Sequence, residues 1–368
     1  MKFYLQMLLL LTFFQPTYSF AKKRADQNNE PLHVSTLESL HRTIHPRSLI
    51  QQLAFYELYP ETSEGKKALK IACGLLFGDD SVEATSLTLP DLDVYSMIGL
   101  VNKQWKESDL VITEKQLSVI DKAASRLEHK KLDGNYVWTK EEVLNLPPEE
   151  VDLARALLIY QFESDSDQKQ KIKEYEATLD LMALQILAKL KKYPSPEEII
   201  TEINDFIFHE MKFRFPPHSL YAKDIDMYTF LPSVMDSRLG VCLGVSTLYI
   251  CLAQRLGLDL EIITPPGHIY LRYNNGNKLI NIETTARGIH LPTETYLGIN
   301  TQYLQRRNIK EVVGLAFFNQ ASVMSAREDH KGAIRLYEIS LQYVKDEPLF
   351  KMLLGMHYLF DGQKVEGT

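Results

Sequence analysis

The sequence predicts an α+β protein in which a small antiparallel sheet lies between two helical regions. Apolar residues at helical spacing, preceded by helix-capping signals, dominate the chain up to about residue 192. Three short strand-like runs follow at 260–264, 268–273 and 278–284, separated by Pro-Pro-Gly and Asn-Asn-Gly-Asn turns. Helical periodicity returns after about residue 308. This order of helices, strands and helices is typical of an α+β fold.

The composition narrows the function classes. The 368 residues are 45% hydrophobic and 24% charged, which is typical of a globular protein and excludes an intrinsically disordered chain. The net charge of -7 argues against a broad basic surface, so no nucleic-acid partner is predicted. Three cysteines without a C-x-x-C pair predict neither a disulfide scaffold nor a structural zinc site. Nothing in the sequence predicts another metal or a cofactor.

Residues 1–21 have the pattern of a secretory signal peptide. Lys2 supplies a positive charge, Phe3 to Phe14 form an apolar run, and Ser19 and Ala21 give the small-x-small spacing of a cleavage site. Cleavage after Ala21 would give an exported protein, either periplasmic or secreted. The alternatives are an uncleaved membrane anchor and a buried N-terminal helix. No later apolar run approaches the roughly 18 residues that span a bilayer, so no further membrane span is predicted.

Residues 22–192 are predicted to form a helical N-terminal region. Thr113 with Gln116, and Thr139 with Glu142, fit the capping box that begins a helix. The residues from about 33 to 190 should be almost wholly helical. They carry no recognisable catalytic or ligand-binding pattern, so we expect no active-site group there, and no role is predicted for the region.

The predicted central domain spans residues 193–300. Ser195 can cap its first helix, with Pro and Glu residues in the first turn. Residues 214–231 are rich in Pro and Tyr without a clear period, which predicts a long ordered loop. A second helix is predicted over 241–256, with Gly257 just past its end.

Cys242 is the candidate nucleophile of this central domain. It lies in the first turn of the predicted helix, where free backbone N–H groups and the helix dipole favour a thiolate. Cys251 is nine residues further on, so it points to the opposite, apolar face of the helix. Cys73 lies in an apolar run. The alternative for Cys242 is the common fate of a free cysteine, which is burial in the core.

A predicted hairpin supplies partners for this thiol. Asn275-Gly276 is the preferred centre of a two-residue type I′ turn, and the resulting register places His268 opposite Glu283. Directly opposed Cβ atoms lie roughly 5 Å apart, so an imidazole and a carboxylate should meet. A base and a group that orients it are what a nucleophilic thiol needs. The alternative is a surface ion pair. The same register pairs Ile269 with Ile282, Leu271 with Ile280, and Tyr270 with Asn281.

Three motifs in order resemble those of the transglutaminase-like superfamily. They are Gly-Val-Cys242 within 236–244, Pro-Gly-His268, and Asn-Ile-Glu283. The resemblance covers roughly residues 195–295 and is most similar to the bacterial Sir-B branch, which often joins this domain to helical repeats. It implies a papain-like fold in which the cysteine helix packs on an antiparallel sheet. It also implies that Cys242 is the nucleophile, His268 the base and Glu283 the acid.

The family pattern leaves two functions open. A protein that keeps all three residues resembles a thiol-dependent protease, amidase or acyl transferase acting on peptide or amide bonds. Many Sir-B-type members lack the cysteine, and the alternative is a non-catalytic module that binds a peptide or protein. Many relatives also carry an aspartate where this chain has Glu283. Tyr221 and Tyr228 are weak candidates for an oxyanion donor, and packing is the preferred role for both. The oligomeric state is not predicted.

The C-terminal segment, residues 308–368, resembles a tetratricopeptide repeat. Small and aromatic residues recur at helical spacing, and Gly355 lies 34 residues after Ala321, which is the period of that repeat. The recurring residues are Ala321, Ala333, Tyr337 and Ser340. One full repeat and part of a second are fewer than a stable solenoid needs. The alternative is therefore a helical hairpin docked on the neighbouring domain.

Overall fold

A computed structural model of the protein describes residues 34–78, 113–217, 225–297 and 304–363. The chain divides into two compact units, residues 1–87 and 88–368. The predicted signal peptide, residues 1–21, lies outside the described residues. Within the described ranges, no helix is both long enough and apolar enough to cross a membrane.

The first unit is helical where the structure describes it. Its helices are α3 (Val34–Arg42), α4 (Leu49–Leu58) and α5 (Ser63–Phe77). Thr62 caps α5 by accepting the N–H of Gly65. Helices α4 and α5 contact each other; Leu53 of α4 is buried, and so are Ala68 and Cys73 of α5.

The described part of the second unit starts at residue 113 with a series of helices and short 3₁₀ turns. They are α7 (Glu114–Ala124), η2 (Glu128–Lys131), η3 (Asp133–Asn135), α8 (Lys140–Asn145), η4 (Pro148–Glu150), α9 (Leu153–Gln161) and α10 (Gln168–Lys189). Both predicted capping boxes are confirmed, at Thr113 before α7 and at Thr139 before α8. Helices dominate 34–78 and 153–190 as predicted, but residues 125–152 contain only 3₁₀ turns and the six-residue α8, so the expectation of an almost wholly helical region is only partly correct; residues 79–112 lie outside the described residues.

Helix α10 is more deeply buried than an amphipathic helix on a protein surface. Between Tyr175 and Ala188 nearly every side chain is buried, including charged ones. Glu176 is held by two hydrogen bonds from Arg155 on α9, at 2.5 and 2.6 Å. Asp180 accepts a hydrogen bond of 2.8 Å from Arg255. These pairs explain how α10 places acidic residues in the core, because buried charges require partners.

The next elements bring the chain to Cys242. They are α11 (Pro196–Asn204), the π-helix η5 (Asp205–Glu210), the 3₁₀ turn η6 (Ile225–Tyr228), α13 (Leu231–Ser237) and α14 (Cys242–Leu256). Ser195 caps α11 as predicted, and Gly257 ends α14 in the left-handed conformation. The loop predicted over 214–231 contains η6 in its described part, and residues 218–224 lie outside the described residues.

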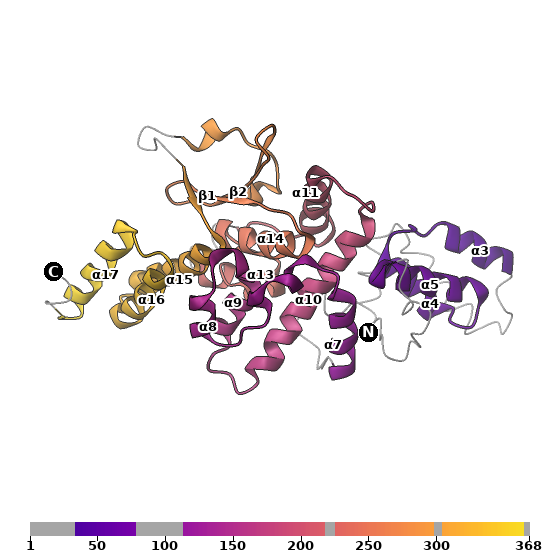
Figure 1. Ribbon diagram of the computed structural model, residues 1–368, viewed down its shortest axis with the longest axis horizontal. Helices are drawn as coiled ribbons and strands as arrows, with labels where there is room; N and C mark the ends of the chain where they lie inside the picture. Colours follow the sequence, from indigo (N-terminus) through magenta and orange to yellow (C-terminus); the bar gives the residue numbers. More distant parts are fainter. Residues whose placement is uncertain (1–33, 79–112, 218–224, 298–303, 364–368) are drawn as a thin grey trace. The chain divides into compact units, whose positions relative to one another are not determined.

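A small antiparallel sheet follows α14 in the chain and contacts that helix through β2 (Figure 1). Its strands are β1 (Glu261–Thr264), β2 (Tyr270–Asn274), β3 (Leu279–Ile282) and β4 (Gln305–Arg307), in the order β3-β2-β1-β4. The first three correspond to the predicted strand-like runs, whereas the three-residue β4 was not predicted. The turns η7 (Thr284–Ala286) and η8 (Thr293–Tyr296) lie between β3 and β4.

Three helices complete the described chain, as Figure 1 shows toward the C-terminus. They are α15 (Ile309–Ala326), α16 (His330–Tyr343) and α17 (Pro348–Phe360). Helices α15 and α16 pack closely, because Ser340 donates a hydrogen bond of 2.8 Å to the carbonyl of Gly314. The small residues Ala321 and Ala333 are fully buried. The prediction of an α+β fold with helical flanks is confirmed.

Candidate functional site

Cys242 is the first residue of α14, and its side chain is half-buried. The preceding residue, Val241, is the N-cap of the helix and has no side chain that could accept a hydrogen bond from the first backbone N–H groups. Two glycines allow close packing around this helix end. A Cβ on Gly240 would lie 2.7 Å from a methyl of Val245, and one on Gly244 would lie 2.3 Å from the carbonyl oxygen of Tyr228. The N-terminus of a helix stabilises negative charge, which suits a reacting thiol.

His268 and Glu283 meet, but through a different register from the predicted one. The structure pairs Leu271 with Ile282 and Arg272 with Asn281, which shifts β3 by two residues relative to β2. His268 and Glu283 therefore lie diagonally, just outside the ends of β2 and β3. A shift of two residues keeps each side chain on its predicted face of the sheet. His268 Nε2 lies 2.8 Å from Glu283 Oε2.

The turn explains the error in register. The N–H of Asn275 bonds to the carbonyl of Lys278, so the two-residue loop is Gly276-Asn277 rather than Asn275-Gly276. Gly276 has φ of +84°, as the first position of a type II′ turn requires. The side chain of Asn275 accepts the N–H groups of Asn277 and Lys278. Asn275 thus serves as a capping side chain outside the loop.

Glu283 has a full set of hydrogen-bond donors. Its side chain is almost completely buried, at 5% exposure. Oε1 accepts from the backbone N–H and the hydroxyl of Thr285, and Oε2 accepts from the Tyr296 hydroxyl at 2.9 Å and faces His268. Burial alone would raise the pKa of Glu283, but the bonds from His268, Thr285 and Tyr296 lower it. The carboxylate is therefore kept ionised in a buried position.

His268 connects this carboxylate to the thiol. Burial would lower its pKa, but the influence of the Cys242 thiol and of the Glu283 carboxylate outweighs burial and raises the pKa of His268 to about 10. Because Nε2 faces Glu283, Nδ1 is the ring nitrogen left to exchange a proton with Cys242. The structure thus brings together the three side chains that the sequence singled out.

A buried hydrogen bond joins the cysteine helix α14 to the turn η7, which directly follows the acid Glu283. Ser246, one turn after Cys242, lies with its hydroxyl 2.9 Å from that of Thr284, and both residues are buried. Thr284 directly follows Glu283. The distance between nucleophile and acid is therefore set by a short link between neighbouring residues, which the sequence did not reveal.

The other two cysteines have different surroundings. Cys251 is completely buried on α14, as predicted, and burial raises its pKa strongly. Cys73 is buried in the first unit, and burial raises its pKa as well. Neither environment favours a thiolate. All three cysteines are free thiols.

Of the two tyrosines considered as oxyanion donors, the structure describes only Tyr228. Tyr228 is buried in η6, and its carbonyl accepts the N–H of Val241 at 2.9 Å, so its observed contacts are those of packing. Tyr221 lies outside the described residues. The residue that the sequence missed is Tyr296. It reaches Glu283 from η8, a connection that no local sequence signal predicts.

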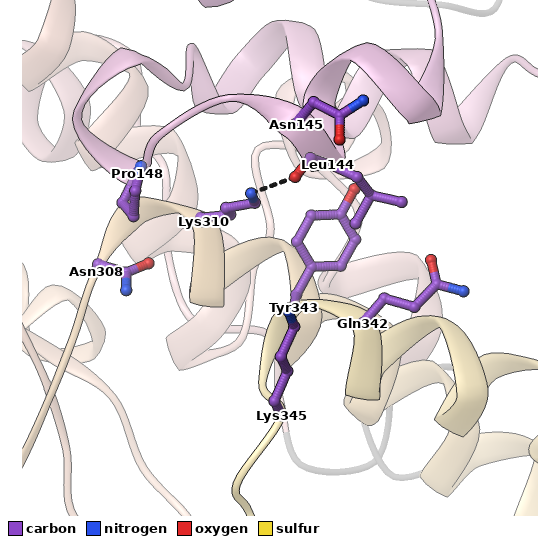
Figure 2. A pocket seen from close by; sticks show the side chains of 8 residues that line it. All are labelled: Leu144, Asn145, Pro148, Asn308, Lys310, Gln342, Tyr343 and Lys345. Atoms are coloured by element: carbon purple, nitrogen blue, oxygen red, sulfur yellow. Dashed lines mark hydrogen bonds between the residues drawn. The ribbon is translucent and has the colours of Figure 1, made fainter.

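A cavity of about 470 Å³ lies elsewhere in the second unit, between α8 and the helices α15 and α16 (Figure 2). Its lining includes Lys310 and Lys345 but none of the three predicted catalytic residues. The Lys310 ammonium donates to the carbonyls of Leu144 and Leu146, at the C-terminus of α8. A cation stabilises a helix at this end, so the observed role of Lys310 is to join α15 to α8.

Comparison with known families supports the resemblance. Residues 173–321 match the model of the transglutaminase-like superfamily. The match covers less than half of the chain, and it includes Cys242, His268, Glu283 and all four strands of the sheet. No curated protein and no solved structure matched the chain.

Proposed function

We propose that the transglutaminase-like segment is a thiol-dependent acyl-transfer site that hydrolyses or transfers peptide or amide acyl groups. Cys242 is the nucleophile, His268 the general base and acid, and Glu283 the group that orients His268. The observation that carries the proposal is a single imidazole whose Nε2 lies 2.8 Å from a buried carboxylate, and whose pKa is raised by the Cys242 thiol at a helix N-terminus and by that carboxylate.

The chemistry follows from the arrangement. His268 takes the proton of the thiol, and Cys242 Sγ attacks the carbonyl carbon of an amide. The tetrahedral intermediate collapses when its C–N bond breaks and His268 gives the proton to the leaving amine, which leaves a thioester on Cys242. Water or a second amine then attacks the thioester, with His268 taking its proton. Release of the acid or the new amide returns the proton to the thiol.

The proposal also covers the family branch of the chain, its export and the nature of its C-terminal segment. The chain is an exported member of the Sir-B-type branch, with a signal peptide at residues 1–21 and a tetratricopeptide-like segment at 308–368. The motif sequences around Cys242 and the 34-residue spacing of Ala321 and Gly355 support these assignments. The substrate is a peptide or protein.

A second function is favoured by a separate observation on α17. Five apolar side chains of this helix are exposed to 42–61%, at the spacing of one helix face. They are Leu349, Met352, Met356, Leu359 and Phe360. Such a face is typical of a helix that contacts a partner, so the alternative is a module that binds a peptide or protein without catalysis.

Alkylation separates the two functions. Brief treatment with iodoacetamide at about pH 6, followed by mass spectrometry, should label Cys242 before Cys73 and Cys251, and His268→Ala should slow the labelling. Casein with a fluorescent primary amine then tests catalysis: amine incorporation indicates transfer and new N-termini indicate hydrolysis, and Cys242→Ala should abolish either. Labelling of Cys242 that His268→Ala leaves unchanged would favour the binding module.

A further inference from the structure

Tyr296 touches two of the three proposed catalytic residues without being in their motifs. Its hydroxyl donates to Glu283 Oε2 at 2.9 Å, the same oxygen that faces His268 Nε2. Its ring is nearly parallel to the imidazole of His268, with an angle of 16° and a centroid distance of 6.0 Å. It also stacks on Tyr270, at 3.9 Å and 11°. Both the polar and the aromatic parts of Tyr296 are thus engaged at the site.

The segment that carries Tyr296 is tied to the sheet. Asn281 is fully buried, and its amide donates to the carbonyl of Leu291 at 2.7 Å and to the hydroxyl of Thr293 at 3.2 Å. Arg272 holds the same segment through Thr293 at 3.3 Å, and it also donates to the hydroxyl of Tyr270 at 2.6 Å. These bonds place η8 beside Glu283, so the position of Tyr296 is determined by side chains of β2 and β3.

We propose that Tyr296 is a positioning residue that holds Glu283 and His268 in the geometry for proton transfer with Cys242. This inference rests on the proposed thiol-dependent function and adds a fourth residue to its site. The hydroxyl fixes Oε2 of Glu283, and the parallel ring limits rotation of the imidazole. Thr285 holds Oε1 and Tyr296 holds Oε2, so without Tyr296 the carboxylate would be fixed at one oxygen only and would lose its alignment with Nε2.

The positioning role of Tyr296 should be visible in how the alkylation rate of Cys242 depends on pH, at the acid end of the range. The hydrogen bond from Tyr296 is among the contacts that lower the pKa of Glu283. Without it, Glu283 takes up a proton at a higher pH and no longer supports the imidazolium. The other charged groups of this cluster, His268 and Arg272, remain in place. A purely structural defect would instead reduce the rate by the same factor at every pH.

The experiment measures iodoacetamide alkylation of Cys242 in the full chain between pH 4.5 and 9. Tyr296→Phe, which keeps the ring, should alkylate about 10- to 150-fold more slowly near pH 6, as loss of one hydrogen bond to a charged group implies. The pH at which the alkylation rate of Tyr296→Phe falls on the acid side should be higher than in the wild type. Tyr296→Leu should be slower still. Tyr273→Phe removes a tyrosine hydroxyl from the same hairpin, away from Glu283, and should match the wild type.

The outcomes separate this inference from the proposed function. If His268→Ala slows alkylation but the Tyr296→Phe profile overlaps that of the wild type, Tyr296 has no positioning role and the proposed function stands. If His268→Ala has no effect, the proposed function fails and the role of Tyr296 fails with it. A rate reduced equally at all pH values in Tyr296→Phe, with a lower melting temperature, would also overturn the inference.

Discussion

The substitution Glu283→Gln tests whether the carboxylate charge holds the proton on His268. The variant keeps the size of the side chain and removes its charge. Every donor around Glu283 needs an oxygen acceptor: Thr285 at Oε1, and Tyr296 with His268 at Oε2. An amide offers only one oxygen, so its NH₂ group must face Thr285 or the His268 side of the site.

The expected fall in the pKa of His268 follows from the loss of its hydrogen bond to a charged carboxylate. A hydrogen bond to a charged group contributes about 1.5–3 kcal/mol, which corresponds to about one to two pH units. The pKa of His268, about 10 in the wild type, should therefore fall to between about 8 and 9. If the NH₂ group faces Nε2, that nitrogen must accept, and Nδ1 then carries the proton and cannot take one from Cys242.

The assay is an NMR titration of the His268 imidazole in ¹⁵N-histidine-labelled protein between pH 5 and 11. Glu261→Gln is the matched control, because Glu261 belongs to the same sheet but pairs with Arg272 and Arg306 rather than with His268. A His268 titration that is the same in the wild type and in Glu283→Gln would refute the reasoning, and so would a pKa that rises in the variant.

The same shift has a consequence for stability. The pKa of His268 is about 10 in the folded protein and about 6.5 in an unfolded chain. A group whose pKa is raised by folding contributes stability that is complete below the unfolded value. This contribution is lost as the pH rises through the folded value. The free energy of unfolding should therefore decline between about pH 6.5 and 10 in the wild type, and decline less in Glu283→Gln.

Two further predictions concern buried groups outside the site. Arg255→Leu removes the 2.8 Å partner of the buried Asp180 carboxylate, which keeps only His129 at 3.2 Å and Lys130 at 3.5 Å, so urea denaturation should show a loss of about 3 kcal/mol, the low end for a broken buried pair. A loss below about 1 kcal/mol would show that this pair does not stabilise the core. Burial and the neighbouring His330 lower the pKa of His357, so folding favours its neutral form. The melting temperature of the wild type should thus fall between pH 7 and 5, and His357→Gln should reduce that fall; an equal fall in both would contradict the assignment.

Local signals explain what could be predicted from the sequence. The caps at Thr113, Thr139 and Ser195 depend on residues within one helical turn, and each forms as expected. The helix of Cys242 and its end at Gly257 follow from the same short-range chemistry. These elements are specified by contacts between near neighbours in the chain, which a sequence displays directly.

The hairpin register could not be fixed in this way. The run Asn274-Asn275-Gly276-Asn277 offers more than one centre for a two-residue loop, and the capping bonds of Asn275 select the one that occurs. The pairing of His268 with Glu283 survives because the error was two residues, which preserves the alternation of faces. Tyr296 escaped prediction because it reaches Glu283 through a turn held by long-range side-chain bonds.

The position of the nucleophile depends on both ends of α14. Near its N-terminus, Ser246 is hydrogen-bonded to Thr284 next to the acid, and near its C-terminus Arg255 is bonded to Asp180 on α10. Gln254 adds bonds to the backbone at the start of α9. Asp180 lies before the predicted domain start at residue 193, and the family match begins earlier, at residue 173. The helices before the central domain therefore contribute to the placement of Cys242, although they supply none of its proposed chemistry.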